Sequence, residues 1–398
     1  MSARVVVAGA GPVGLTTALT LARDGHAVTV LEAGETLAAE SRASTYHPPS
    51  LEMLAELGVL DDLLERGIVS TRFQYRDRRT GPIAELDLGS LADDTPYPFR
   101  VQCEQSKLTP ILLERLQAYA DVEVVFGQPV TAVEQVDDVV RVTTATGSPW
   151  TADWVVGADG ASSVVRKSIG AEFEGITYPE RFLVVSTHED LATVLPGIAD
   201  VNYVYDPDEW LVLLRTPEHW RILFPTDPDS PDDVETAPER VQARLADVAD
   251  LGRPWDLLHA SLYRVHQRVA DRFRVGRVVL VGDAAHVNNP LGGMGMNSGL
   301  HDAVLAGRAL ADLLAGRAGT AELDTVLAAR RDVALSYVRT VTHDNWKQLR
   351  ENDEEARAAH HAELRALAAD PVAARTYLRR TSMIDSLRPL EAGAGTRS

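Results

Sequence analysis

The chain has 398 residues, 45% of them hydrophobic and 24% charged, and its 58 acidic and 39 basic residues give a formal net charge of −19. This composition is typical of a soluble globular protein with two or three domains. The acidic balance argues against nucleic acid or an anionic membrane surface as a partner, because either would require a basic face. The lone cysteine, Cys103, leaves no disulfide framework and no cysteine-based metal site, and we expect no metal.

The N-terminal residues 5–22 are largely apolar and could be mistaken for a signal peptide. Three glycines and Pro12 interrupt this stretch, and a second strand pattern ending in Glu32 follows directly. The pattern therefore predicts a strand over 4–8, a tight turn, a helix and a strand over 27–31. No other segment approaches 18 unbroken apolar residues, so we expect no membrane span and a cytoplasmic protein.

The rest of the chain mixes helix and strand patterns. Helices are predicted over about 48–66 and 106–119, and strands near 71–88, 122–126, 130–144 and 153–158. Residues 181–275 read mostly as strands, interrupted by an acidic loop with prolines over 225–233. A buried strand over 277–281 precedes a helix marked by apolar residues after Asn297, and helices are predicted from about 321 onward.

These segments predict an α/β protein in which sequence order differs from domain order. A Rossmann-like domain is expected from residues 1–75, 98–180 and 276–345. A β-sheet domain that binds substrate is expected from residues 76–97 and 181–275, and residues 346–398 are expected to form a C-terminal helical segment.

The first motif that carries chemistry is the turn Gly9-Ala10-Gly11-Pro12-Val13-Gly14. Gly9 allows the tight turn, Gly11 lets the backbone approach a pyrophosphate, and Gly14 lets the helix pack on the strand. The helix N-terminus supplies N–H donors and the positive end of its dipole. Glu32, at the end of the second strand and followed by Ala33, would accept hydrogen bonds from ribose hydroxyls. The motif predicts a dinucleotide site without distinguishing NAD from FAD.

Two further motifs make that distinction. Residues 154–166 contain Asp159-Gly160, and residues 277–297 contain Gly282-Asp283 followed by Pro290 and the segment from Gly292 to Asn297. Together with the N-terminal turn they resemble the class A flavoprotein aromatic hydroxylases, which have the para-hydroxybenzoate hydroxylase fold. The resemblance covers most of residues 1–345 and departs from the family pattern at Asn289, where a proline is common, and at Met294.

The resemblance implies FAD as the resident cofactor and assigns residues to it. The N-terminal turn, Glu32 and Ala33 would hold the AMP half, and Asp159 and Gly160 would lie near the pyrophosphate and the approaching nicotinamide. The remaining implied contacts are Arg42 and Val130 to the cofactor, Gln105 and Asp283 to the ribityl chain, and Gly293, Gly295, Met296 and Asn297 to the flavin pyrimidine edge.

Elementary chemistry agrees with these assignments. Reduced flavin carries negative charge at N1 and C2=O, which the N–H groups of residues 295–297 could stabilise at a helix start. The Asp283 carboxylate suits hydroxyls better than phosphates. Pro290 offers a rigid apolar surface beside a flavin ring.

Candidates for substrate contact are His47 and Arg215. His47 precedes two prolines and is either a helix-entry residue or a neighbour of the isoalloxazine. Strand alternation places Leu211, Leu213 and Arg215 on one face. Arg215 would then either anchor the carboxylate or phenolate of a substrate or pair with a surface acid.

Other conspicuous side chains have structural interpretations. His286 is expected to be a structural hydrogen-bonding residue, and His301 with Asp302 a pair on a helix surface. The aromatic residues of the strand-rich region are expected in the sheet core rather than in a substrate wall; these are Tyr203, Tyr205, Trp210 and Trp220.

The resemblance implies an FAD-dependent monooxygenase that consumes NADH or NADPH and hydroxylates a small phenolic or heteroaromatic substrate with O2, through a flavin C4a-hydroperoxide. A single dinucleotide motif fits a resident FAD and a transient nicotinamide, in a monomer or homodimer. The same fold could instead perform epoxidation, Baeyer–Villiger insertion or decarboxylative oxidation. A non-catalytic FAD-binding redox sensor is a further alternative, whereas the motif of flavin halogenases is absent.

Overall fold

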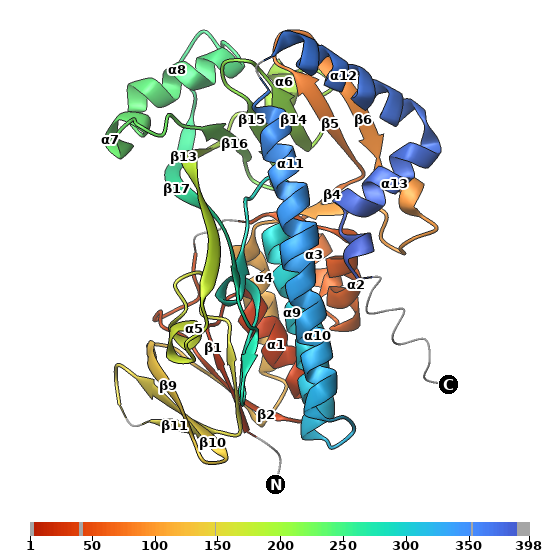
Figure 1. The fold of residues 1–398 in the computed structure, drawn as a ribbon. Helices are drawn as coiled ribbons and strands as arrows, with labels where there is room; N and C mark the ends of the chain where they lie inside the picture. Colours follow the sequence, from red (N-terminus) through yellow and green to blue (C-terminus); the bar gives the residue numbers. More distant parts are fainter. Residues whose placement is uncertain (1–3, 40–42, 148, 352, 388–398) are drawn as a thin grey trace.

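The computed structural model describes residues 4–39, 43–147, 149–351 and 353–387. Figure 1 shows two parts stacked along the long axis of the molecule. The lower part contains a mostly parallel sheet, and the upper part contains a larger mixed sheet with helices at its outer end.

The lower part is built on a six-stranded sheet with the order β18-β19-β12-β1-β2-β8. Its parallel strands are β1 (Arg4–Ala8), β2 (Ala27–Leu31), β8 (Val122–Val125), β12 (Trp154–Gly157) and β19 (Val278–Leu280), and β18 (Arg274–Val275) joins antiparallel. Helices α1 (Pro12–Arg23), α4 (Gln105–Leu116) and α9 (Met294–Leu314) pack with it into one core. The first two strands have the predicted bounds, and β1 is apolar because it is central and covered on both faces.

Two small sheets and three short helices complete the lower part. The sheets contain β3 (Thr45–Tyr46), β7 (Arg100–Gln102) and β4 (Ile68–Ser70), and β9 (Val130–Val136), β10 (Val139–Thr144) and β11 (Trp150–Ala152). The helices are α2 (Pro48–Glu56), α3 (Leu60–Arg66) and α5 (Val164–Ser168). The helical segment predicted over about 48–66 is confirmed as two helices, α2 and α3, which are separated at Gly58, where the backbone adopts a left-handed φ of +70°.

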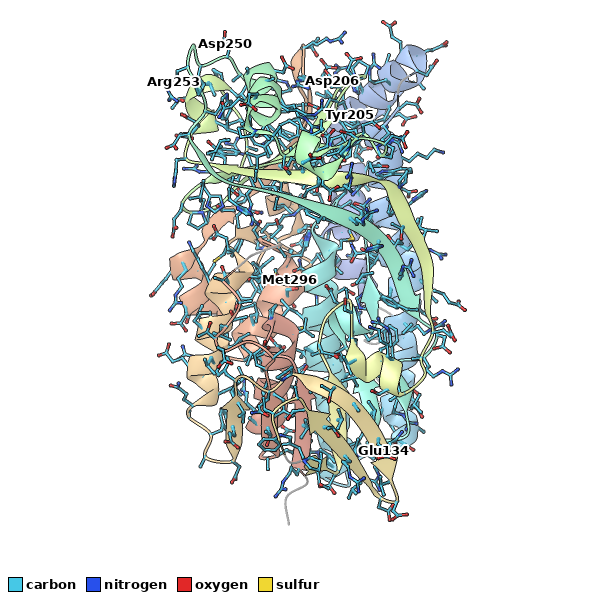
Figure 2. All side chains as sticks on the ribbon, turned by 90° about the vertical axis from the view of Figure 1, so that its left-hand side faces the viewer. Glu134, Tyr205, Asp206, Asp250, Arg253 and Met296 are labelled. Carbon is cyan, nitrogen blue, oxygen red and sulfur yellow. The ribbon has the colours of Figure 1, made fainter. Side chains whose placement is uncertain are left out.

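The upper sheet has eight strands in the order β20-β17-β13-β16-β15-β14-β5-β6. They are β5 (Arg72–Asp77), β6 (Gly81–Asp87), β13 (Phe173–Thr187), β14 (Val201–Tyr205), β15 (Leu211–Arg215), β16 (Trp220–Pro225), β17 (Leu257–Ala270) and β20 (His286–Val287). The long antiparallel pair β13 and β17 bends from the upper sheet down toward the lower part (Figure 2). This pair of strands therefore connects the upper part to the lower part.

Residues 181–275 also contain helices that the strand-rich interpretation missed: α6 (Leu191–Val194), α7 (Asp232–Glu235) and α8 (Pro238–Val248). Helix α8 buries Val241 and Leu245 against the sheet. The sequence of α8 contains few apolar residues, because only one narrow face of the helix contacts the core. Its first residues also closely follow an acidic loop, so no change in composition indicated where the helix begins.

From Thr320 onward the described chain is helical, as predicted. Helix α10 (Thr320–Asp332), a π-helical turn η3 (Val333–Val338) and α11 (Arg339–Leu349) run continuously from the lower to the upper part (Figure 1). Helices α12 (Glu354–Ala369) and α13 (Pro371–Thr381) then pack on the upper sheet, where Leu364 and Leu378 join the cluster of Phe73 and Leu86. Single 3-10 turns are η1 (Leu88–Leu91), η2 (Gly282–Ala284) and η4 (Ile384–Ser386). Within the described ranges, no helix has the length and apolar character of a membrane span.

The interpretation of His301 and Asp302 as a surface pair was wrong. Both side chains are buried, at 0% and 1% exposure. Helix α9 carries them, and it packs against α1, α2 and α10, so it presents almost no surface at this level. The prediction for His286 is confirmed, because its Nε2 lies 2.7 Å from the Asp302 carboxylate in a buried contact.

Candidate cofactor and substrate site

A cavity of about 520 Å³ lies where the two parts meet. In Figure 2 Met296, which lines it, lies between Tyr205 of the upper sheet and Glu134 of the lower part. The lower part contributes loops, the first turns of three helices and a residue of β3 to its lining, including Gly11, Pro12, Val13, Thr45, Gln105, Gly160, Asp283, Pro290, Gly293, Gly295 and Met296. The upper sheet contributes one face of its strands, including Val184, Val201, Tyr203, Val212, Leu214, Arg221, Leu223 and Tyr263. The segments predicted to bind the cofactor and the upper sheet therefore line one and the same cavity.

Two helix N-termini open into this cavity. Helix α1 follows Gly11 and α9 follows Gly293. Both N-cap residues are glycines, so no N-cap side chain binds the first-turn N–H groups. Neither first turn contains an acidic residue. The first-turn N–H groups and the positive dipole ends therefore face a space suited to anionic groups such as a pyrophosphate and a reduced flavin.

The glycines of the first turn have different surroundings. A Cβ on Gly9, whose φ is +103°, would lie 2.5 Å from the Ala158 carbonyl oxygen, and a Cβ on Gly14 would lie 2.0 Å from the Gly9 carbonyl oxygen. A Cβ on Gly11 would have nothing within 4 Å. Gly9 and Gly14 therefore permit the packing of the turn, and Gly11 leaves open space for a bulky ligand. This cradle fits FAD.

Two of the predicted acidic residues hold loops. The Glu32 carboxylate accepts hydrogen bonds from the Ala10 N–H at 2.6 Å and the Gly34 N–H at 2.9 Å. The Asp159 carboxylate accepts from the Ser163 hydroxyl at 2.6 Å and from backbone N–H groups at the start of α5. Asp283, in contrast, is exposed at the cavity wall.

His47 and Asn297 hold the backbone of Gly292 and Gly293 in place. Asn297 accepts from the His47 N–H at 2.8 Å and donates to the Gly293 carbonyl at 2.7 Å, and His47 Nε2 donates to the Gly292 carbonyl at 2.9 Å. Both side chains are fully buried and neither lines the cavity. Burial and the nearby Arg100 hold the pKa of His47 well below its ordinary value, so its imidazole is neutral. His47 is the N-cap residue of α2, so its interpretation as a helix-entry residue is confirmed.

The remaining cofactor candidates separate into two groups. Gln105, the first residue of α4, and Pro290 line the cavity, whereas Val130 at the start of β9 and Ala33 after β2 do not. Arg42 lies outside the described residues. Within those residues, no group of three or more His, Cys, Asp or Glu side chains is placed to hold a metal ion.

Arg215 lies away from the cavity. Its side chain is 45% exposed and its guanidinium lies 3.6 Å from the Asp200 carboxylate. Alternation does place Leu211, Leu213 and Arg215 on one face, but that face packs toward α8, and Val212 and Leu214 face the cavity. Of the two interpretations of Arg215, pairing with a surface acid is confirmed and a pocket-facing position was wrong, because α8, which packs on Leu211 and Leu213 of the same face, was not predicted.

Arg100 and Arg221 line the cavity instead, and the sequence analysis missed both. Arg100 is 2% exposed, its guanidinium lies 4.4 Å from the ring centroid of Phe73, and it hydrogen-bonds Tyr203. Among the described residues no salt bridge joins Arg100 to a carboxylate, whereas Glu104 partly offsets the effect of burial on the pKa of Arg221. One feature of the sequence could have indicated Arg100: it is the single charged residue within the run 95–103.

A cluster of tyrosines surrounds Arg100, and one of them, Tyr203, lines the cavity as well as the sheet core, so the expectation that it lies in the core rather than in a substrate wall was wrong. Tyr75 and Tyr203 stack with ring centroids 5.5 Å apart, and the Tyr75 and Tyr377 hydroxyls lie 2.5 Å apart. Burial lowers the pKa of Arg100, and Tyr203 and Tyr75 offset part of this effect. An arginine stays protonated in such surroundings, so a nearly uncompensated positive charge faces the cavity.

Comparisons with known proteins place this geometry in a family. Residues 2–341 match the family described as an FAD binding domain. The para-nitrophenol 4-monooxygenase of Pseudomonas sp. strain WBC-3 is 34% identical over 395 residues, which is 97% of each chain. The 6-hydroxy-3-succinoylpyridine 3-monooxygenase of Pseudomonas putida strain S16 is 36% identical over 355 residues, which covers 88% of this chain and 89% of that enzyme.

Solved structures agree. The crystal structure of p-nitrophenol 4-monooxygenase from Pseudomonas putida DLL-E4 has a TM-score of 0.90 at 33% identity and covers 96% of this chain and 98% of that one. Aklavinone-11 hydroxylase, solved with FAD and aklavinone, has a TM-score of 0.79 at 28% identity and covers 89% of this chain and 70% of that one. The chain therefore belongs to the FAD-dependent class A flavoprotein monooxygenases that act on aromatic compounds.

Proposed function

We propose that this monooxygenase consumes NADH or NADPH and O2 to hydroxylate a small phenol that binds as an anion. The observation that carries the proposal is the buried Arg100, which has no carboxylate partner among the described residues and lies at the wall of a cavity that the FAD-binding turn also lines. A buried cation without a counter-ion is costly, and an anionic oxygen of the substrate would compensate it. Relatives matching nearly the whole chain act on p-nitrophenol, a compound of this class.

Different residues of the cavity would exclude water and bind the substrate. Bound FAD, when reduced, supplies the reactivity that transfers one oxygen atom from O2 to the ring. The aliphatic face of Val184, Val212 and Leu223 would exclude water from the aromatic ring. Arg100 and the Tyr203 hydroxyl would bind the anionic oxygen and hold the ring in one orientation.

The cofactor contacts are proposed on the same geometry. The α1 N-terminus beyond Gly11 would bind the pyrophosphate, and the N–H groups of Gly295 and Met296 would stabilise negative charge on the flavin. Asp283 and Gln105 would bind ribityl hydroxyls. The Glu32 carboxylate would accept hydrogen bonds from ribose hydroxyls in addition to the hydrogen bond that it accepts from the Ala10 N–H.

The test is a screen for aromatic compounds that accelerate NADH or NADPH oxidation by the purified holoenzyme. Simple phenols are expected to accelerate it, with the product heavier by one oxygen atom, and the matched methyl ethers are expected to be inactive. Acceleration by the ethers as well would contradict binding as an anion. A different mass change would indicate another oxidation on this fold, and no acceleration by any aromatic compound would favour a redox sensor.

Asp283→Ala tests the cofactor assignment. The wild-type protein is expected to be yellow, and the variant is expected to keep its fold but to bind FAD about tenfold or more weakly, because it loses charged hydrogen bonds to ribityl hydroxyls. The fold should survive because Asp283 is exposed at the cavity wall. Titration of the apoprotein with FAD measures the effect, and an unchanged affinity would remove Asp283 from the site.

A further inference from the structure

Beneath the loop that carries Asp283 lies a buried ionic network, consisting of Asp302, Arg330 and His286. Arg330 is fully buried, and its Nε donates to Asp302 Oδ1 at 2.7 Å. The other oxygen, Oδ2, lies 2.7 Å from His286 Nε2 and accepts the Gly282 N–H at 3.1 Å. One carboxylate therefore joins a side chain of α10 to the backbone of η2.

The charges of this network are strong and nearly isolated from water. Burial alone would raise the pKa of Asp302, but the guanidinium of Arg330 and then His286 lower that pKa to about 2. The carboxylate is therefore ionised across the physiological range. Arg330 also donates to the Ser298 hydroxyl at 3.0 Å, so the network extends into the second turn of α9, beside the other cofactor loop.

The turn held by this network is fixed on both sides of Asp283. On one side the Gly282 N–H is bound by Asp302, and Gly282 has a left-handed φ of +58° with Val13 packed where its Cβ would be, 3.0 Å away. On the other side the Ala284 carbonyl accepts from the buried Arg166 at 2.9 Å. Asp283 is thus a cavity residue between two buried anchor points.

We propose that Asp302 and Arg330 are positioning residues for FAD. Neither lines the cavity, and both act by holding the Gly282–Ala284 turn so that the Asp283 carboxylate points at the ribityl chain. The inference rests on the proposed role of Asp283. It predicts that FAD affinity depends on a charge pair that FAD does not touch.

The first experiment compares Asp302→Asn with a matched control. Apoprotein is titrated with FAD by fluorescence quenching, and the melting temperature is measured on the same samples. Asp302→Asn is expected to weaken FAD binding about tenfold, because a charged acceptor of the Gly282 N–H becomes neutral. Glu235→Gln is the control, because Glu235 is fully buried and pairs with Arg244 at 3.0 Å in the upper part, outside the cavity. It is expected to lower the melting temperature without changing FAD affinity.

A second variant separates stability from positioning. Asp302→Leu combined with Arg330→Met removes both charges, and replacing a buried ion pair by apolar side chains of similar volume often restores stability. This double variant is expected to melt near the wild-type temperature and still bind FAD weakly, since the Gly282 N–H has no acceptor. Wild-type FAD affinity in this folded variant would overturn the proposal.

The third measurement tests whether Asp302 acts through Asp283. In an Asp283→Ala background, Asp302→Asn is expected to cause little further loss of FAD affinity, because residues that act through one another are non-additive. A full additional tenfold loss would show that Asp302 acts by another route. If Asp283→Ala itself leaves FAD affinity unchanged, the ribityl assignment fails, and the proposed substrate chemistry remains testable by the NADH and NADPH screen.

Discussion

Gly11→Val is expected to give a folded protein that does not retain FAD. Gly11 has an ordinary φ of −71°, and a Cβ there meets nothing within 4 Å, so the fold tolerates a side chain. The branched side chain would fill the space into which a pyrophosphate must come to reach the N–H groups of α1. We expect FAD affinity to fall at least about a hundredfold, a loss of roughly 3 kcal/mol, measured by titration of the apoprotein.

Two neighbouring variants serve as controls for this result. Gly14→Val should reduce the yield of folded protein, because its Cβ would collide with the Gly9 carbonyl at 2.0 Å. Glu32→Gln should weaken FAD binding by only about 0.5–1.5 kcal/mol, because the glutamine side-chain oxygen can still accept hydrogen bonds from ribose hydroxyls. Similar FAD titrations for Gly11→Val and Glu32→Gln would show that Gly11 does not adjoin the pyrophosphate.

Arg100→Met is expected to raise the KM for a phenolic substrate about tenfold or more, which corresponds to roughly 1.5–3 kcal/mol of lost charged hydrogen bonding. Methionine keeps an unbranched apolar stem and removes the guanidinium, and with it both the charge and the contact with the Phe73 ring. FAD content should not change, because the cofactor loops are contributed by other residues. Steady-state kinetics with NADH or NADPH oxidation provide the measurement.

Arg215→Met is the matched control, since Arg215 pairs with Asp200 at a half-exposed position outside the cavity. Its KM should equal that of the wild type. A raised KM in the control together with an unchanged KM in Arg100→Met would return the substrate anchor to the residue expected from the sequence.

The parts of the fold that could be predicted from the sequence are those set by local signals. The strand, glycine turn and helix over residues 4–23 follow from an apolar run and the conformations that only glycine allows. The cofactor motifs could be found for the same reason, because a backbone that approaches a phosphate needs particular residues at short spacing. Ten of the predicted site residues line the cavity: Gly11, Pro12, Val13, Gln105, Gly160, Asp283, Pro290, Gly293, Gly295 and Met296.

The errors concern properties that depend on distant segments. Alternation along β15 shows which residues share a face, but only the packing of α8 decides that Arg215 faces away from the cavity. Arg100 reaches the cavity because β14 places Tyr203, a hundred residues later in the chain, beside it. Asp302 is buried because α10 supplies Arg330 as its partner. None of these pairings leaves a periodic pattern in the sequence.

The order of strands in the lower sheet has a consequence for the protein's synthesis. Strand β1 emerges from the ribosome well before its neighbour β12, which ends at Gly157, and before the next strand, β19, which ends at Leu280. A nascent chain therefore carries an apolar sheet edge without its partner until Leu280 has been translated, and such edges attract chaperones or aggregate. Asp283 and Met296 emerge later still, so FAD can act as a folding ligand only after these residues have been translated.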